Sequence, residues 1–145
     1  MAENKTKILV SVDGSDNSKR ALVKAKEHGE INNAEITILT VLDHTFLLHY
    51  ARTTASKTED SENREKAGEE ILEEALEYFK DYDGEVFTTM RNGYPADEIL
   101  EEASFGNFDL IVMGSRGLGV FSRTFLGSVS NKVLNHTKSN VLIVK

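Results

Sequence analysis

Hydrophobic residues along this chain follow two patterns that alternate. Short runs rich in Val, Ile and Leu are typical of strands that a parallel sheet buries on both faces. Between these runs, apolar residues recur at the three-to-four-residue spacing of a helix that has one buried face. The strand-like runs occupy residues 8–12, 35–42, 86–90, 109–113 and 140–144, and the helical spacing covers residues 15–29, 58–82, 95–104 and 128–136. We therefore predict strands and helices in alternation along the whole chain.

Residues that favour helix ends support several of these boundaries. Ser15 is a favoured N-cap with Asp16 in the turn that follows, and Gly29 is placed to end the first helix. The only proline, Pro95, suits the first turn of the third helix. Residues 43–57 follow neither pattern and are longer than a usual connection. Two interpretations of that segment stay open, a lid or partner surface and a short helical turn packed on the body.

The alternation predicts an α/β fold. We expect a single-domain, Rossmann-like three-layer sandwich with helices on both faces of a five-stranded parallel sheet. Ligands of such sheets bind beyond the carboxyl ends of the strands, where the direction of winding reverses. Asp13 after the first strand and Gly114 after the fourth meet there in the strand order 3-2-1-4-5, which is our prediction. The run at 140–144 is then an apolar edge strand, and a symmetric homodimer through it would cover that edge.

Composition and charge narrow the class of protein. The 145 residues include 39% hydrophobic and 28% charged residues and no cysteine, and the formal net charge is −7. No apolar stretch reaches the length of a membrane span, and the acidic charge opposes binding of a long polyanion such as DNA. The N-terminal residues lack the apolar region of a secretory signal. We expect one cytoplasmic domain that binds neither a membrane nor nucleic acid.

The candidate chemistry lies in residues 108–130, FDLIVMGSRGLGVFSRTFLGSVS, which contain the fourth strand, a glycine-rich loop and the start of a helix. The loop glycines are Gly114, Gly117, Gly119 and Gly127, and the arginines are Arg116 and Arg123. Glycines let the backbone approach a ligand, and the helix that follows would direct N–H groups and its positive dipole end at an anion. The sequence lacks the residues that a Walker loop or a dinucleotide fingerprint requires. We interpret the segment as a phosphate-binding loop, and the alternative is a flexible connector in which Ser128 only caps the helix.

Two other groups of polar residues do not indicate a site. The four histidines, His28, His44, His49 and His136, have no metal-ligand spacing. The acidic residues Asp97, Glu98, Glu101 and Glu102 have helical spacings that place them largely on an outer, solvated face. We therefore expect no metal site made by protein side chains.

Several segments together resemble the universal stress protein family along nearly the whole chain. They are ILVSVDGSDNS, NGYPADEIL, DLIVMGSRG, LGSVS and SNVLIVK. The spacing of Gly114, Gly117 and Gly127 resembles the nucleotide loop of this family's ATP-binding members. The resemblance implies a universal stress protein domain over residues 1–145.

The resemblance also implies contacts to ATP. Asp13 would contact the adenosine part with Val12 beside it; the alternative is a carboxylate that only caps the next helix. Val41 would meet the adenine through its backbone, and Met113 and Gly114 would approach the nucleoside. The residues implied to receive the phosphates are Arg116, Gly117, Gly127, Ser128, Val129 and Ser130.

In function, the resemblance implies a cytoplasmic homodimer that binds ATP, with Mg²⁺ or Mn²⁺ bridging the phosphate oxygens, and that regulates a stress response. No Walker acidic strand or water-positioning glutamine is recognisable, so we expect binding with slow or no hydrolysis. Two alternatives stay open. One is an ATPase or adenylate-transferring enzyme, and the other is a nucleotide-free interaction module that acts through residues 43–57 and the dimer edge.

Overall fold

The computed structural model describes residues 5–43, 61–116 and 126–145. The strands are β1 (Lys7–Ser11), β2 (Glu35–Leu42), β3 (Val86–Asn92), β4 (Leu110–Gly114) and β5 (Asn140–Val144). All neighbouring strands are parallel, in the order β3-β2-β1-β4-β5. The predicted α/β fold and strand order are therefore confirmed, with β3 and β5 at the two edges of the sheet.

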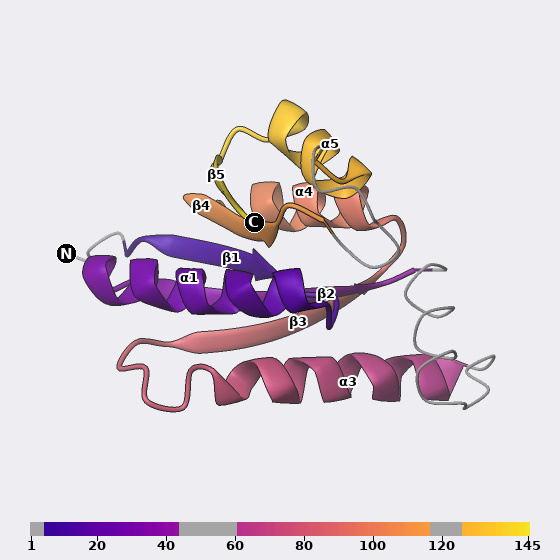
Figure 1. Ribbon diagram of the computed structural model, residues 1–145, viewed down its shortest axis with the longest axis horizontal. Helices are drawn as coiled ribbons and strands as arrows, with labels where there is room; N and C mark the ends of the chain where they lie inside the picture. The colour runs from indigo at the N-terminus through magenta and orange to yellow at the C-terminus, as the bar shows by residue number, and fades with distance from the viewer. Residues whose placement is uncertain (1–4, 44–60, 117–125) are drawn as a thin grey trace.

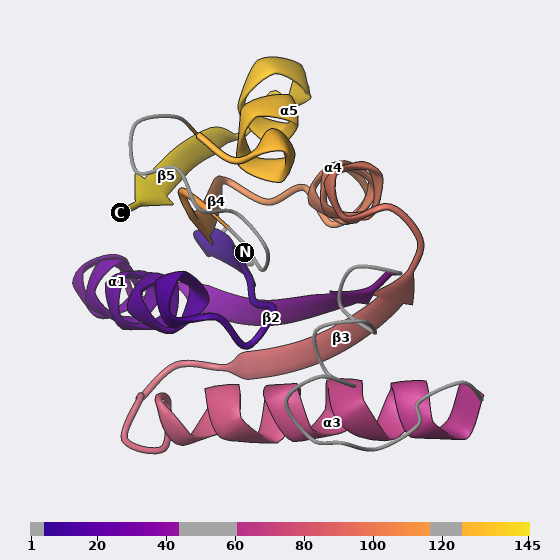
Figure 2. The same cartoon turned by 45° about the vertical axis from the view of Figure 1, so that its right-hand side comes forward.

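Helices cover both faces of the sheet, as Figures 1 and 2 show. On one face lie α1 (Asp16–Asn32) and α3 (Ser61–Glu77), and on the other lie α4 (Pro95–Phe105) and α5 (Ser128–His136). Alternate residues of β1 point into the two layers. Ile8 and Val10 pack in the core under α1 and α3, whereas Leu9 packs in the core under α4 and α5. The central strands are therefore apolar at nearly every position.

The first helix does not end at Gly29, contrary to our prediction. α1 continues to Asn32, and Asn33 forms the C-cap in the left-handed conformation, with φ of 51°. Gly29 is needed for packing, because a Cβ there would lie 2.5 Å from Tyr82 Oη and 2.9 Å from Ile36 Cδ1. The glycine thus lets α1 lie close to the sheet and to the segment that follows α3.

The helix predicted over 58–82 is wrong at its C-terminal end, and residues 58–60 lie outside the described part of the chain. α3 ends at Glu77. The backbone then continues in turns with hydrogen bonds between residues three apart, including Tyr82 N–H to the Phe79 carbonyl at 3.0 Å. These turns bring Tyr82 Oη to the Ala34 carbonyl at 2.5 Å. Helical spacing alone could not reveal this long-range hydrogen bond.

The remaining boundaries agree with the predictions to within two residues, and β2, α5 and β5 match them at both ends. β3 continues to Asn92 because Arg91 and Asn92 still pair with Val41 and Leu42 of β2. The mixed polarity of β3 agrees with its place at an edge of the sheet. None of the helices in the described ranges is long and apolar enough to cross a bilayer.

Gly29→Ala is expected to lower the free energy of unfolding by about 1 kcal/mol. Overpacking against Tyr82 and Ile36 costs about 1–3 kcal/mol, and the higher helix propensity of alanine offsets about 1 kcal/mol of it. Urea denaturation followed by circular dichroism measures the difference. The same substitution should cost less in a Tyr82→Phe background, which lacks the nearest atom, and an equal cost in both backgrounds would contradict the packing described above.

Candidate functional site

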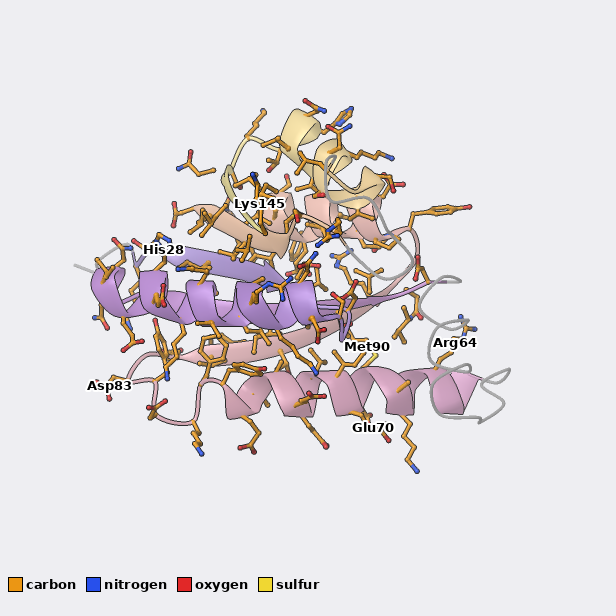
Figure 3. The ribbon with its side chains drawn as sticks, viewed as in Figure 1. His28, Arg64, Glu70, Asp83, Met90 and Lys145 are labelled. Carbon is orange, nitrogen blue, oxygen red and sulfur yellow. The ribbon has the colours of Figure 1, made fainter. Side chains whose placement is uncertain are left out.

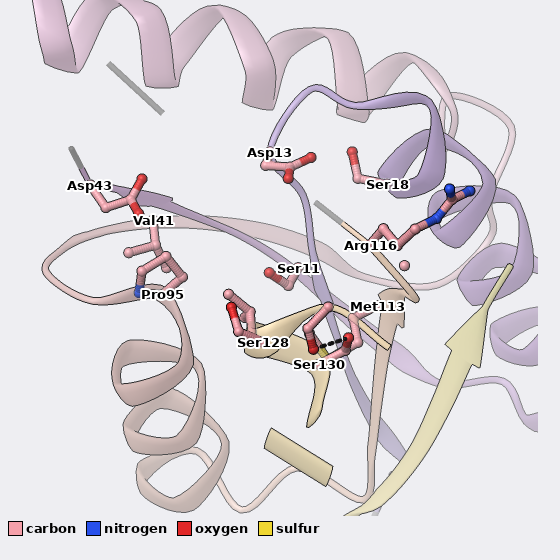
Figure 4. Close-up of a pocket in the computed structure, with 13 residues that line it drawn as sticks. Ser11, Asp13, Ser18, Val41, Asp43, Pro95, Met113, Arg116, Ser128 and Ser130 are labelled. Carbon is pink, nitrogen blue, oxygen red and sulfur yellow. Dashed lines mark hydrogen bonds between the residues drawn. The ribbon is translucent and has the colours of Figure 1, made fainter. Parts of the chain in front are cut away.

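A pocket of about 130 Å³ opens at the carboxyl ends of β1, β2 and β4, beside the N-termini of α4 and α5 (Figure 4). The lining residues are Ser11, Asp13, Ser18, Val41, Asp43, Pro95, Met113, Gly114, Arg116, Gly127, Ser128, Val129 and Ser130. The winding of the sheet reverses between β1 and β4, which are neighbours. The pocket therefore lies where doubly wound sheets bind their ligands.

The floor of the pocket is the face of the sheet that α4 and α5 cover. Val41 and Met113 belong to the core under these helices and are buried. Ser11 ends β1 on the same face, two residues beyond Leu9, and is the polar member of the floor. Val12 points the other way, into the core under α1 and α3, where it is 3% exposed. The floor offers a largely apolar surface with one hydroxyl group in it.

Asp13 lies in the turn between β1 and α1, at the rim of the pocket (Figure 4). Its Oδ1 accepts a hydrogen bond from the Ser15 N–H at 2.9 Å. Ser15 is the N-cap of α1, and its hydroxyl accepts from the Ser18 N–H at 3.2 Å. The predicted Ser15 cap is therefore confirmed, and the alternative in which Asp13 caps α1 is wrong. Asp13 stabilises the turn that carries it and adds a carboxylate to the pocket lining.

The N-terminus of α5 meets the pocket without a side-chain cap. Its N-cap is Gly127, so the alternative in which Ser128 caps the helix is wrong, and its first turn has no acidic residue. In contrast, α1 has a serine cap and an acidic first turn, and α4 has two acidic residues in its first turn. The first N–H groups of a helix have no intrahelical acceptor, and with the helix dipole they favour an anion. The start of α5 therefore gives the pocket a positive potential.

Hydrogen bonds to Ser115 hold the start of α5 at the end of β4. The Ser115 carbonyl accepts from the Gly127 N–H at 2.7 Å and from the Ser130 hydroxyl at 2.9 Å. That hydroxyl is also 3.1 Å from the Gly127 carbonyl, as the dashed line in Figure 4 marks. The Ser115 N–H donates to the Val144 carbonyl of β5 at 2.8 Å. The Ser130 hydroxyl therefore stabilises the fold, and the backbone N–H of Ser130 is left to bind an anion.

Asn17 of α1 holds the other side of the loop. A Cβ at Gly114 would lie 2.8 Å from Asn17 Cβ, so this strand end needs a glycine where the helix passes it. Asn17 Nδ2 donates to the Arg116 carbonyl at 3.2 Å, and Asn17 Oδ1 accepts from the Arg20 guanidinium. Arg20 Nε also donates to the Lys145 carbonyl at 3.1 Å. A buried asparagine therefore connects the pocket to the residue that follows β5.

Arg91 positions α4 at the opposite side of the pocket. Its guanidinium is 2.9 Å from a Glu102 oxygen and 3.0 Å from a Glu98 oxygen. The hydrogen bonds from Glu102 and then Glu98 raise the pKa of Arg91. Glu98 and Glu102 are only 20% and 17% exposed, so our prediction of a solvated face is wrong for these two residues. The prediction of a solvated face agrees better with Glu101 and Asp97, which are well exposed.

The structure brings together most of the residues that the sequence predicted as a site. Those that line the pocket are Asp13, Val41, Met113, Gly114, Arg116, Gly127, Ser128, Val129 and Ser130. Val12 is not among them, because it faces the opposite layer of the sandwich. Gly117, Gly119, Arg123 and residues 44–57 lie outside the described part of the chain.

Sequence reasoning missed four residues of the lining, namely Ser11, Ser18, Asp43 and Pro95. A signal existed for Asp43, because it follows β2 as Asp13 follows β1. Ser11 lies one residue before Val12, and the strand alternation could have pointed to it. In the described ranges, no group of three or more His, Asp or Glu residues could hold a metal ion.

The fold and the pocket define a doubly wound α/β protein with an anion-favouring site at the switch point of its sheet. The sequence profile of the universal stress protein family matches residues 5–145, and this chain belongs to that family. Universal stress protein YxiE of Bacillus subtilis is 37% identical over 150 residues, which cover 96% of this chain and 98% of that protein.

Two solved structures extend the comparison. Hypothetical protein MJ0577 matches with a TM-score of 0.76 at 27% identity, over 97% of this chain and 95% of that one. A universal stress protein in complex with cAMP matches with a TM-score of 0.72 at 30% identity, over 97% of both chains. The family resemblance and the fold inferred from the sequence are thus confirmed.

Asn17→Ala is expected to lower the free energy of unfolding by about 1–3 kcal/mol, because it leaves the Arg116 carbonyl and the Arg20 guanidinium without this partner. Chemical denaturation measures the change. Asn135→Ala is the matched control, since Asn135 bonds to Asn131 on the exposed face of α5, and it should change stability by less than about 0.5 kcal/mol. Equal effects of the two substitutions would contradict the linking role of Asn17.

Proposed function

We propose that this protein binds ATP in the pocket at the carboxyl edge of the sheet and acts in the cytoplasm as a nucleotide-dependent regulator of a stress response. The observation that carries the proposal is the uncapped, acid-free start of α5, which shares one pocket with Asp13. The helix start suits phosphate groups, and a carboxylate suits the two hydroxyl groups of a ribose. A nucleotide presents both kinds of group on one small molecule.

The nucleoside would lie on the apolar floor. Val41 and Met113 provide buried side chains there, and Pro95 lies beside Val41 in Figure 4. We assign the adenine to the backbone of Val41 and the ribose hydroxyls to Asp13. Val12 would support the floor from the opposite layer and make no direct side-chain contact. A flat base on this floor buries apolar surface, which favours binding.

The phosphates would lie at the start of α5. We assign them to the backbone N–H groups of Ser128, Val129 and Ser130, with Gly114 and Gly127 allowing close approach and Arg116 adding charge. Gly117 keeps its assignment to the phosphates as part of the proposal. The net charge of −7 does not oppose this, because exposed charges are screened beyond about 8 Å at physiological salt.

The donor groups of the pocket fit a divalent ion held mainly by the phosphates. Mg²⁺ keeps several waters and is usually bound by one or two carboxylates together with phosphate oxygens. The lining includes two carboxylates, Asp13 and Asp43, whereas the described residues contain no three-ligand cluster. Mg²⁺ or Mn²⁺ would therefore arrive with ATP, held mainly by its phosphate oxygens, and would neutralise part of their charge.

The family relationship supports an adenine nucleotide as the ligand class, because a relative at 30% identity was solved with cAMP. Calorimetric titration of nucleotide-free protein with AMP, ADP, ATP and cAMP, with and without Mg²⁺, tests the choice of ATP. Tightest binding of ATP with Mg²⁺ is expected. Single-turnover assays of phosphate release should show slow or no hydrolysis, and rapid release would favour the ATPase alternative. Absence of heat with all four ligands would contradict the proposal.

Ser128→Glu is expected to weaken ATP binding by at least tenfold while keeping or raising thermal stability. A carboxylate in the first turn interacts favourably with the helix dipole, by about 0.3–1 kcal/mol. The same charge repels phosphate, and like charges 4 Å apart cost about 4 kcal/mol at an effective dielectric constant of 20. Calorimetry and thermal unfolding measure the two effects. Ser128→Gln is the control, because glutamine has the length of glutamate without its charge. Equal losses of ATP affinity in both variants would contradict an electrostatic role of this helix start.

We further propose a homodimer through β5. Among the strands that the structure describes, β5 pairs with β4 alone, which leaves its other edge open. Asn140 N–H and the Val144 carbonyl both bond to the β4 side, so the alternation of a parallel strand directs the N–H groups of Val141 and Ile143 outward. Val141 and Ile143 are partly buried apolar residues, and an open apolar edge favours pairing with a second copy.

Val141→Pro is expected to give a monomer, because proline removes an outward N–H group and spares the bonds to β4. Size-exclusion chromatography with light scattering measures the mass. Thr88→Pro is the matched control, since the bonds of Glu85 and Gly93 to β2 direct the Thr88 N–H outward on the other edge strand. A dimer that persists in Val141→Pro and dissociates in Thr88→Pro would place the interface at β3 instead.

A further inference from the structure

Ser11 places a hydroxyl group in the middle of the pocket floor. It is the last residue of β1 and pairs in register with Leu39 of β2. Val41 and Met113, the other floor residues, are apolar and buried in the core under α4 and α5. The core would accept an apolar side chain at this position, so the hydroxyl is not required by packing.

The Ser11 hydroxyl has no hydrogen-bond partner among the residues that the structure describes. Three neighbouring hydroxyl groups are engaged: Ser18 donates to the Ser15 carbonyl at 2.9 Å, Ser130 to the Ser115 carbonyl at 2.9 Å and Thr40 to the Val12 carbonyl at 2.8 Å. The remaining hydroxyl of the lining belongs to Ser128, which is exposed at the start of α5. No fully buried side-chain polar atom in the described ranges is left without a partner, so the Ser11 oxygen is accessible from the pocket that it lines. It is therefore available to a ligand.

The position of Ser11 indicates which part of a ligand its hydroxyl can contact. Figure 4 shows Ser11 between Asp13 on one side and Ser128 and Ser130 of α5 on the other. A carboxylate attracts hydrogen-bond donors and repels anions, whereas the helix start attracts anions. The hydroxyl group lies at the boundary between these two regions. In a nucleotide, the matching boundary is the junction of the sugar and the first phosphate.

We propose that Ser11 is a specificity-determining residue that donates its hydroxyl hydrogen to the first phosphate of the bound nucleotide. This inference rests on the proposed function and adds a contact that the family resemblance did not imply. Because the first phosphate is common to AMP, ADP and ATP, Ser11 favours nucleotides over nucleosides without distinguishing the length of the phosphate chain. A hydrogen bond to a charged group is stronger than one between neutral groups.

The test is a calorimetric comparison of Ser11→Ala with the wild-type protein, using adenosine, AMP, ADP and ATP as ligands. The affinities for the three nucleotides are expected to fall alike, by about tenfold, while the affinity for adenosine stays unchanged. Ser11→Cys keeps the size of the side chain but donates more weakly, and it should shift the same three affinities in the same direction. Ser104→Ala, at an exposed position of α4 remote from this pocket, should leave all four unchanged.

Three results of this comparison would contradict the inference. Wild-type protein that binds none of the nucleotides would overturn the proposed function and this inference together. Wild-type binding with unchanged affinities in Ser11→Ala would overturn the inference alone. An equal loss for adenosine and the nucleotides would also overturn it, because the hydroxyl would then contact the nucleoside or support the floor.

Discussion

The site depends on the carbonyl of Ser115, which joins the end of β4 to the start of α5. It accepts hydrogen bonds from the Gly127 N–H and the Ser130 hydroxyl, and the N–H of the same residue is bound to the Val144 carbonyl in β5. The first turn of α5 is thereby fixed over the carboxyl edge of the sheet.

Local charge, and not net charge, explains how an acidic protein can offer a phosphate site. The chain carries a formal charge of −7, yet the start of α5 has neither an acidic residue nor a capping side chain. The carboxylates of the pocket, Asp13 and Asp43, follow β1 and β2, whereas Arg116 follows β4. The pocket therefore has an acidic side and a positive side. Such a polarity favours a ligand with hydroxyl or amino groups at one end and an anion at the other.

The sequence predicted the α/β fold well because the alternation of apolar runs and helical spacings is local. The strand order was predicted from the expectation that ligands bind where the winding of the sheet reverses. The sequence also predicted that Asp13 and Gly114 meet at one edge. The sequence did not predict features that depend on contacts between residues far apart in the chain. Gly29 packs against Tyr82 instead of ending α1, and Arg91 pairs with glutamates that helical spacing had placed in solvent. Ser11 was missed because nothing in the neighbouring sequence shows that its hydroxyl lacks a partner among the residues that the structure describes.

The measurement that tests the central claim most directly is a ¹H–¹⁵N NMR titration of nucleotide-free protein with ATP and Mg²⁺. If the start of α5 receives the phosphates, the amide signals of Ser128, Val129 and Ser130 should shift most, together with those of Gly114 and Arg116. Adenosine should shift the signals near Val41 and Asp13 and leave the α5 amides largely unchanged. Saturating ATP that moves no amide in the first turn of α5 would contradict the phosphate site described here.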